Sequence, residues 1–306
     1  MTPRLIDNSK DFDSIWTKIS SEQVEIDKYL ENNIPQQTFY SIKRTWLHQI
    51  SNRYLLHQLN ESKLKEVTLD EISFETFSYL DIKFDIINKS QSIEFLLKYI
   101  YHPDYDPSGG LKVGFRTAKE NILFKENLEK ALLIIKNTDK DAYLMIKNHL
   151  HSICPVFTKN PLIKGDVISF TLDYSNGLIF YSPCPAILSA ETLIHETRHN
   201  VLNLILKEYS MVKNEDFKVM TPLRDDPRPM LGLVHQSYVL YGLTAFYRNL
   251  ILQDVYKEMK NVIKRFNVHM NDYRNSVNIL NNHRFNLSNK GLQLLDIMLS
   301  DLENHG

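Results

Sequence analysis

The residues with the clearest chemical potential lie in the segment SAETLIHETRHNVLNLIL, at positions 189–206. His195 and His199 are four residues apart, so on an α-helix their imidazoles lie one above the other and reach a common point. Two neutral ring nitrogens in that arrangement suit a divalent metal ion. Glu196 follows the first histidine and can place its carboxylate beside a metal-bound water. The spacing predicts a metal centre with a catalytic carboxylate next to it.

The simpler interpretation is an accidental match, in which both histidines are core residues with satisfied hydrogen bonds. Leu193, Ile194 and Leu202 surround the motif and predict a largely buried helix. Two histidines, a glutamate and an arginine inside such a helix cost free energy unless they have partners. We therefore favour a metal site over satisfied core histidines.

A third ligand is expected, because two histidines hold an ion too loosely. Leu202 and Ile205 stand where the metzincin motif requires glycine and histidine, which excludes that subclass. Glu208, expected on the same helix, and Glu215, in a charged loop, are available as acidic ligands. His235 is the best candidate, because it is a lone histidine in the apolar helical segment MLGLVHQSYVLYGL.

Two arginines stand shortly before His235, in the segment PLRDDPRPMLGLVH. Its prolines restrict φ and predict a rigid loop that presents Arg224 and Arg228. A guanidinium can bind a carboxylate through two parallel hydrogen bonds. Taken alone, this segment favours an Arg–Asp cluster that closes the loop. Beside a metal site, it also suits a clamp for a small dicarboxylate cosubstrate.

Together these segments resemble a known family, the 2-oxoglutarate-dependent HExxH-type peptide β-hydroxylases, which modify ribosomally made peptides. The resemblance rests on LIHETRHNVLNLIL followed by TPLRDDPRPMLGLVHQSYVLYGLTAFY, with the strand NGLIFYS before them. It covers roughly residues 165–250. The combination of motif helix, Arg-Pro loop and trailing histidine is more specific than the HExxH pattern alone.

The resemblance implies an Fe(II) centre held by His195, His199 and His235, with 2-oxoglutarate as cosubstrate. Arg228, or alternatively Arg224, would pair with the far carboxylate of 2-oxoglutarate. The implied reaction is oxidative decarboxylation to succinate, coupled to hydroxylation of a peptide side chain at its β-carbon. The implied partner is a peptide or protein substrate, such as a ribosomally made precursor peptide.

Two alternatives to this dioxygenase stay open. In a zincin-like zinc metallopeptidase, Glu196 would activate the water, His235 or Glu215 would be the third ligand, and a β-hairpin would align the peptide. In the dioxygenase, Glu196 would instead orient a ligand or a metal-bound water. A catalytically inactive binding or scaffold protein is the third reading, and the intact motif argues against it.

The segments that must position these residues are mainly helical. Two β-rich runs joined by Ser175-Asn176-Gly177 predict a hairpin directly before the motif helix. Apolar residues at three- and four-residue spacing predict helices elsewhere. The expected elements are helices over 92–101, 120–137, 231–252, 250–266 and 289–299, strands over 167–172 and 178–181, and loops over 102–114 and 218–230.

The fold class predicted is α+β and predominantly α-helical, with a small antiparallel β-hairpin or sheet beside the HExxH helix. We expect a mainly helical part over 1–155 and a metal-binding catalytic part over 156–306. No composition break separates them, so they are expected to form one packed unit.

Composition narrows the function classes. The 306 residues include 43% apolar and 24% charged residues and carry a net charge of −1, which favours neither nucleic acid nor an anionic membrane surface. No apolar run has the roughly 18 residues of a membrane span, and the first residues do not form a secretory signal. We therefore expect a cytoplasmic protein in which Cys154 and Cys184 are buried, reduced thiols.

Overall fold

The computed structural model describes residues 74–87, 113–115, 118–158, 169–171, 177–221, 224–253 and 260–305. Within these residues the chain is predominantly α-helical with a smaller content of strand, which confirms the predicted α+β class. The helix expected over 92–101 and residues 102–112 of the expected loop lie outside the described residues.

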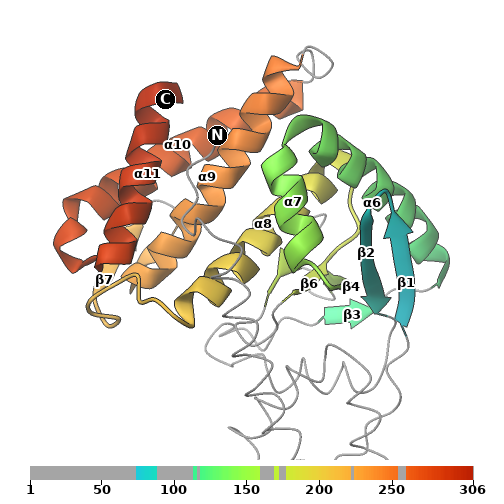
Figure 1. The fold of residues 1–306 in the computed structure, drawn as a ribbon, viewed down its shortest axis with the longest axis horizontal. Coiled ribbons are helices and arrows are strands. Elements are labelled where there is room, and N and C mark those ends of the chain that lie inside the picture. The colour runs from blue at the N-terminus through green and yellow to red at the C-terminus, as the bar shows by residue number, and fades with distance from the viewer. Residues whose placement is uncertain are drawn as a thin grey trace, which may run out of the picture. The chain divides into compact units, whose positions relative to one another are not determined.

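The main sheet is larger than the hairpin that was expected. Its strands lie in the order β1 (Phe74–Tyr79), β2 (Ile82–Ile87), β4 (Ser152–Thr158), β6 (Leu178–Tyr181) and β5 (Ser169–Phe170), and β3 (Val113–Phe115) pairs with β4 beside this path (Figure 1). The contacts of β4 with β2 and β6 are parallel, whereas β1–β2 and β5–β6 are antiparallel. All four residues of β6 are buried, as a central strand covered on both faces requires.

Strands β1 and β2 were not expected in the mainly helical first part. The two-residue alternation that marks them is clearest in β2, where Ile82, Phe84 and Ile86 are buried and Lys83 is exposed. Each strand is only six residues long, so the alternation extends over few positions. A β1–β2 hairpin therefore forms in the part expected to be mainly helical, at residues for which no element had been predicted.

The hairpin before the motif helix is confirmed, with a shorter first strand than expected. Ser169 of β5 lies opposite Tyr181 of β6. Gly177 has a φ of 80°, a left-handed conformation that glycine adopts without a Cβ penalty. A Cβ at this position would also lie 2.4 Å from Cδ2 of His151, whose backbone N–H donates to the Gly177 carbonyl at 2.8 Å. The Asn-Gly signal thus marks a turn that also ties β6 to the start of β4.

Helix α6 (Ala118–Thr138) begins beside this sheet, and α7 (Lys140–His149) follows it. The rings of Phe124 in α6 and Tyr181 in β6 lie 5.2 Å apart, and Lys125 forms an ion pair with Glu75 of β1. The apolar face of the first half of α6 is therefore buried against the sheet. The helix predicted over 120–137 is confirmed.

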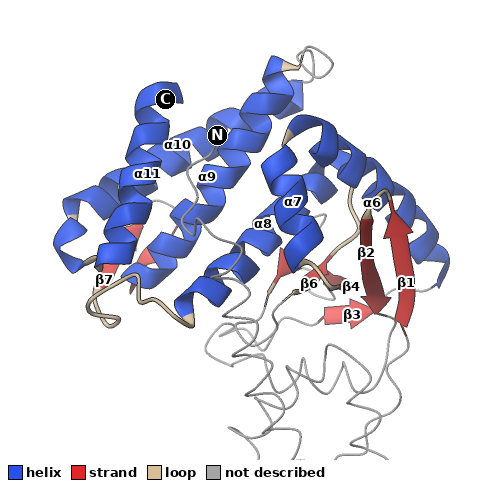
Figure 2. Cartoon of the chain, in the orientation of Figure 1, coloured by secondary structure: helices blue, strands red, loops and turns tan. Residues whose placement is uncertain are grey.

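The remaining helices are α8 (Ala186–Leu206), α9 (Met230–Leu252), α10 (Lys260–Asn282) and α11 (Asn289–His305). Helix α9 packs along α10, and α10 also contacts α11 (Figures 1 and 2). Buried apolar side chains from all four helices form one core, which includes Leu202, Ile205, Leu233, Val234, Tyr273, Val277, Leu295 and Met298. The helices predicted at the motif, over 231–252 and over 289–299 are confirmed.

The Pro-rich segment before α9 is a β-hairpin, so the prediction of a loop there was wrong. Strands β7 (Lys218–Thr221) and β8 (Arg224–Pro229) pair antiparallel, with Val219 opposite Arg228. Proline lacks a backbone donor, but it is tolerated in a strand whose other edge needs no hydrogen bond. A two-stranded sheet has such edges, which explains how β8 accommodates Pro227 and Pro229.

Contacts group the described residues into two compact units. One comprises Leu132–Ile146 and Leu193–Gly306, and the other comprises the described residues up to Ala131 together with Lys147–Thr192. The division expected at residue 155 stays a prediction. Cys154 and Cys184 are both buried free thiols, as predicted.

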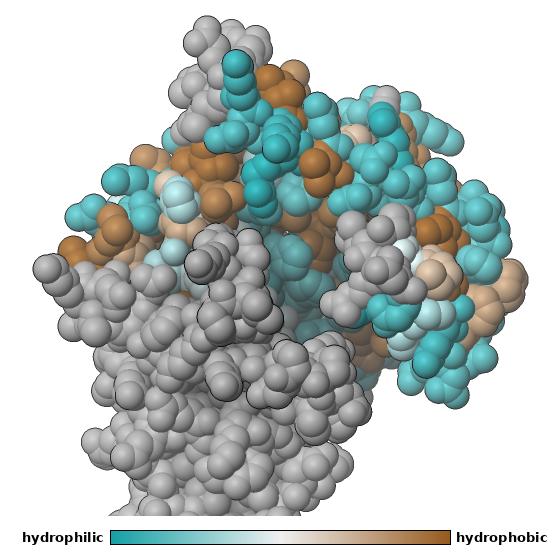
Figure 3. All heavy atoms as spheres, turned by 180° about the vertical axis from the view of Figure 1, so that it is seen from behind, coloured by the Kyte–Doolittle hydropathy of each residue, from teal (hydrophilic) through white to brown (hydrophobic). Residues whose placement is uncertain are grey.

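The described part of one face of the molecule is mainly polar. Hydrophilic residues predominate among the described atoms of the face drawn in Figure 3, and apolar residues form small groups between them. None of the described helices combines the length and the apolar character that a membrane crossing demands.

Candidate functional site

Helix α8 brings His195 and His199 together as their spacing predicts. Their Nε2 atoms lie 3.2 Å apart, and the two ring centroids are 4.9 Å apart. Two nitrogens at this separation, each about 2.1 Å from a shared ion, would subtend an angle of about 100° at the ion, close to tetrahedral or octahedral values. The two Nε2 atoms are therefore close enough to share one divalent cation, and they are also at hydrogen-bond distance from each other.

His235 joins the pair from α9, the second helix. Its Nδ1 lies 3.3 Å from Nδ1 of His199, and the two rings stack with centroids 5.5 Å apart. His199 thus faces one histidine with each of its nitrogens, and these two nitrogens point in different directions. The described residues contain no group of three or more His, Cys, Asp or Glu side chains arranged to hold a metal ion. The three predicted ligands are neighbours, but their nitrogens do not converge on one point as they stand.

The environment keeps His199 neutral. Burial lowers its pKa well below the usual 6.5, and the neighbouring His195 and His235 lower it further. A neutral imidazole is the form that binds a metal, so protons compete weakly at this ring near pH 7. Near neutral pH, His199 is therefore in the neutral form that a metal ligand requires.

The Glu196 side chain is buried next to His195. Its residue is only 2% exposed, and its Oε1 is 3.8 Å from Nε2 of His195. The carboxylate is thus close to the nitrogen that faces His199, the side on which an ion would bind. The role of this carboxylate beside a metal-bound water or ligand stays a prediction.

Arg198, between the two histidines in sequence, fastens α8 to α9. Its guanidinium carbon lies 4.9 Å from the ring centre of Tyr238 and 5.3 Å from that of Tyr241, and its Nη1 donates to the Tyr238 carbonyl at 3.2 Å. Gly242 makes room for it, because a Cβ there would lie 1.6 Å from Nε of Arg198. This contact holds the helix of His199 beside the helix of His235.

The sequence reasoning missed this role of Arg198. The signal was present on α9, where Tyr238, Tyr241 and Gly242 stand at three- and four-residue spacing and so share one helix face. Two aromatic rings beside a glycine, which has no side chain, leave space for a guanidinium to pack on the rings. The partner could not be identified from the sequence, because it lies forty residues away on another helix.

The predicted arginines lie on β8. Arg228 is half-buried, and β8 leads directly into α9, seven residues before His235. Arg224 is the first residue of β8, and its side chain lies outside the described side chains. A paired strand holds the Arg228 backbone more firmly than the expected loop would.

The acidic alternatives for the third ligand are exposed. Helix α8 ends at Leu206, so Glu208 lies in the turn after the helix and not on it, as had been expected. Glu215 lies in an exposed turn of the following segment, in agreement with the charged loop predicted. His235 is accordingly the candidate that the structure places beside the pair.

No family model matches the chain, and no curated protein is found to be similar to it.

Proposed function

We propose that this protein is an Fe(II)- and 2-oxoglutarate-dependent dioxygenase that hydroxylates a peptide side chain at the β-carbon. The observation that carries the proposal is the contact of three histidines from two helices, with nitrogen separations of 3.2 and 3.3 Å. The half-buried Arg228 on the strand leading into α9 supports a cosubstrate with a carboxylate.

Each residue has a defined task in this proposal. His195 and His199 of α8 would hold the iron, and His235 of α9 would supply the third ligand. When bound, Fe(II) would supply the activation of dioxygen, of which one oxygen atom oxidises 2-oxoglutarate to succinate and CO₂ and the other becomes the hydroxyl group of the product. Arg228, with Arg224 as the alternative, binds the far carboxylate and so orients the cosubstrate. Glu196 accepts a hydrogen bond from a ligand at the centre and fixes its position.

A zinc metallopeptidase is the second candidate function, and the placement of Glu196 favours it. A buried carboxylate 3.8 Å from His195 Nε2 lies where a general base would take a proton from a metal-bound water. His235 would again be the third ligand. The two candidates share the ligands and differ in the metal and in the need for oxygen.

Metal content and oxygen dependence distinguish the candidates. Protein purified without oxygen should bind one Fe(II), show a weak visible band when 2-oxoglutarate is added, and release succinate in air with a library of peptides. Stoichiometric zinc and peptide cleavage without oxygen would replace the proposal with the peptidase. Binding of neither metal would refute both functions.

The third ligand has its own test. The variant His235→Ala should lose most of its iron affinity and retain the circular dichroism spectrum of the parent. His269→Ala, in α10, is the matched control and should bind iron like the parent. Unchanged iron content in His235→Ala would remove residue 235 from the metal centre.

A further inference from the structure

A polar pocket of about 470 Å³ lies at the ends of several helices, within the unit that comprises Leu132–Ile146 and Leu193–Gly306. Its wall contains Thr138 at the end of α6, the first residues of α7, the last turns of α9 and the last turns of α11. The volume falls in the range of small-molecule sites. None of the residues assigned to iron, 2-oxoglutarate or catalysis lines it.

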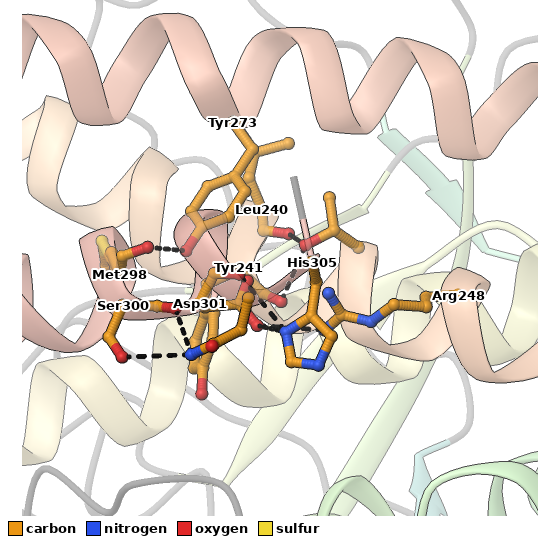
Figure 4. Close-up of polar contacts among 10 residues, drawn as sticks. Leu240, Tyr241, Arg248, Tyr273, Met298, Ser300, Asp301 and His305 are labelled. Carbon is orange, nitrogen blue, oxygen red and sulfur yellow. Dashed lines mark hydrogen bonds and ion pairs between the residues drawn. The ribbon is translucent and has the colours of Figure 1, made fainter.

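A largely buried ion pair forms part of the wall. Nη2 of Arg248 donates to Oδ1 of Asp301 at 3.0 Å, and Nδ1 of His305 lies 3.2 Å from the same oxygen (Figure 4). The Asp301 side chain is only 10% exposed and that of Arg248 only 17%. Both charges of the pair are therefore largely removed from water.

Each residue of this ion pair has one polar side-chain atom without a hydrogen bond to the described residues. Nη1 of Arg248 and Oδ2 of Asp301 are buried and have no hydrogen-bond partner among the described residues. Buried polar atoms are almost always paired, and an unpaired atom on a charged group is especially costly. A donor and an acceptor left over on one ion pair match a ligand that carries both an acceptor and a donor.

The charged groups that line the pocket indicate whether the hydrogen-bond donor of the ligand is neutral or cationic. Three carboxylates line the pocket (Asp139, Asp141 and Asp301), together with the two cations Lys140 and Arg248 and the imidazole of His305. Helices α6, α9 and α11 also end at this pocket, and helix C-termini carry partial negative charge. The opposite dipole at the start of α7 is already satisfied by Asp139, whose Oδ1 accepts from the Ala142 N–H at 2.9 Å. The pocket therefore favours a ligand with a cationic group.

We infer that this pocket binds an α-ammonium group with an adjacent carbonyl or carboxylate oxygen, as found in free amino acids and at peptide N-termini. The ammonium donates to Oδ2 of Asp301, and the adjacent oxygen accepts from Nη1 of Arg248. A bare metal ion fits less well, because it leaves the Arg248 donor unused. A simple anion is opposed by the three carboxylates. The inference does not depend on the proposed dioxygenase activity.

Isothermal titration calorimetry of the full chain tests the inference. A metal chelator in the buffer keeps iron off the protein, so the measured binding does not depend on the proposed metal centre. The probes are the twenty common L-amino acids, tested singly, the corresponding X-alanine dipeptides, and the N-acetyl derivative of each compound that binds. At least one amino acid or dipeptide should bind, and its acetylated form should not. Binding by the dipeptides alone would identify a peptide N-terminus as the ligand, and binding by the amino acids alone a free amino acid.

Two variants connect the binding to the pocket. Asp301→Asn should weaken binding more than about tenfold, because it removes the carboxylate that faces the ammonium. Asp296→Asn, an exposed carboxylate on the same helix, is the control and should bind like the parent. Asn304→Trp blocks the pocket from an exposed position and gives the answer if Asp301→Asn does not fold. Absence of binding by every probe, equal binding by acetylated probes, or undiminished binding in the folded pocket variants would overturn the inference.

Discussion

Replacing Gly242 with alanine should loosen the contact between α8 and α9, because a Cβ at this position has no room. It would lie 1.6 Å from Nε and 2.2 Å from Cζ of Arg198. The guanidinium would have to leave its place over the rings of Tyr238 and Tyr241 and give up its hydrogen bond to the Tyr238 carbonyl. The substitution therefore acts on Arg198 more than on α9 itself.

The expected cost follows from the contacts that are lost. A partly desolvated cation–π contact contributes about 0.5–2 kcal/mol, and a hydrogen bond to a charged donor about 1.5–3 kcal/mol. Because alanine has a higher helix propensity than glycine, the substitution also stabilises the helix by up to about 1 kcal/mol. The net loss should be about 1–4 kcal/mol in the free energy of unfolding, or roughly 2–16 °C in Tm for a unit of this size.

Gly232 provides the matched control on the same helix. A Cβ at this position meets nothing within 4 Å, so Gly232→Ala should be neutral or stabilising by up to about 1 kcal/mol. In an Arg198→Ala background, Gly242→Ala should also cease to be destabilising, because the colliding side chain is gone. Urea and thermal unfolding, followed by circular dichroism, compare the parent with Gly232→Ala, Gly242→Ala, Arg198→Ala and the Arg198→Ala/Gly242→Ala double variant. If Gly242→Ala is as stable as the parent while Arg198 is present, the reasoning about this contact is refuted.

Three further outcomes are expected. Gly291→Ala should lower the free energy of unfolding by about 1–3 kcal/mol in urea titrations, because its Cβ would lie 2.1 Å from the Met211 carbonyl oxygen, and unchanged stability would contradict that close approach. Burial, followed by the neighbouring His151, lowers the pKa of His149 from 6.5 to about 4. The unfolded chain then binds this proton more tightly, so the stability contribution is full above pH 6.5 and is lost as the pH falls toward 4. As the pH falls from 6.5 to 4, the unfolding midpoint of His149→Gln should decrease less steeply than that of the parent. The same pH dependence in both proteins would show that His149 does not cause the loss of stability. Steady-state kinetics of Arg228→Ala should show a raised KM for 2-oxoglutarate with nearly unchanged iron content, and the reverse pattern would remove Arg228 from the cosubstrate site.

The sequence alone was sufficient where structure depends on neighbours a few residues apart. The pairing of His195 with His199 follows from helical spacing, and the turn at Gly177 follows from the Asn-Gly dipeptide before two apolar residues. Helices α6, α8, α9 and α11 were predictable for the same reason, because their apolar residues recur at helical intervals. Such patterns are local, and tertiary contacts strengthen them without changing their type.

Only the tertiary structure decided which distant side chains meet. The approach of His235 to His199 depends on how α8 and α9 pack, and that packing depends on a guanidinium seated beside a glycine on the other helix. The pairing of β7 with β8 and the ion pair between Arg248 and Asp301 also join residues whose local patterns do not name their partner. Packing free energy between separate elements selects these contacts, and no short stretch of the sequence carries that information.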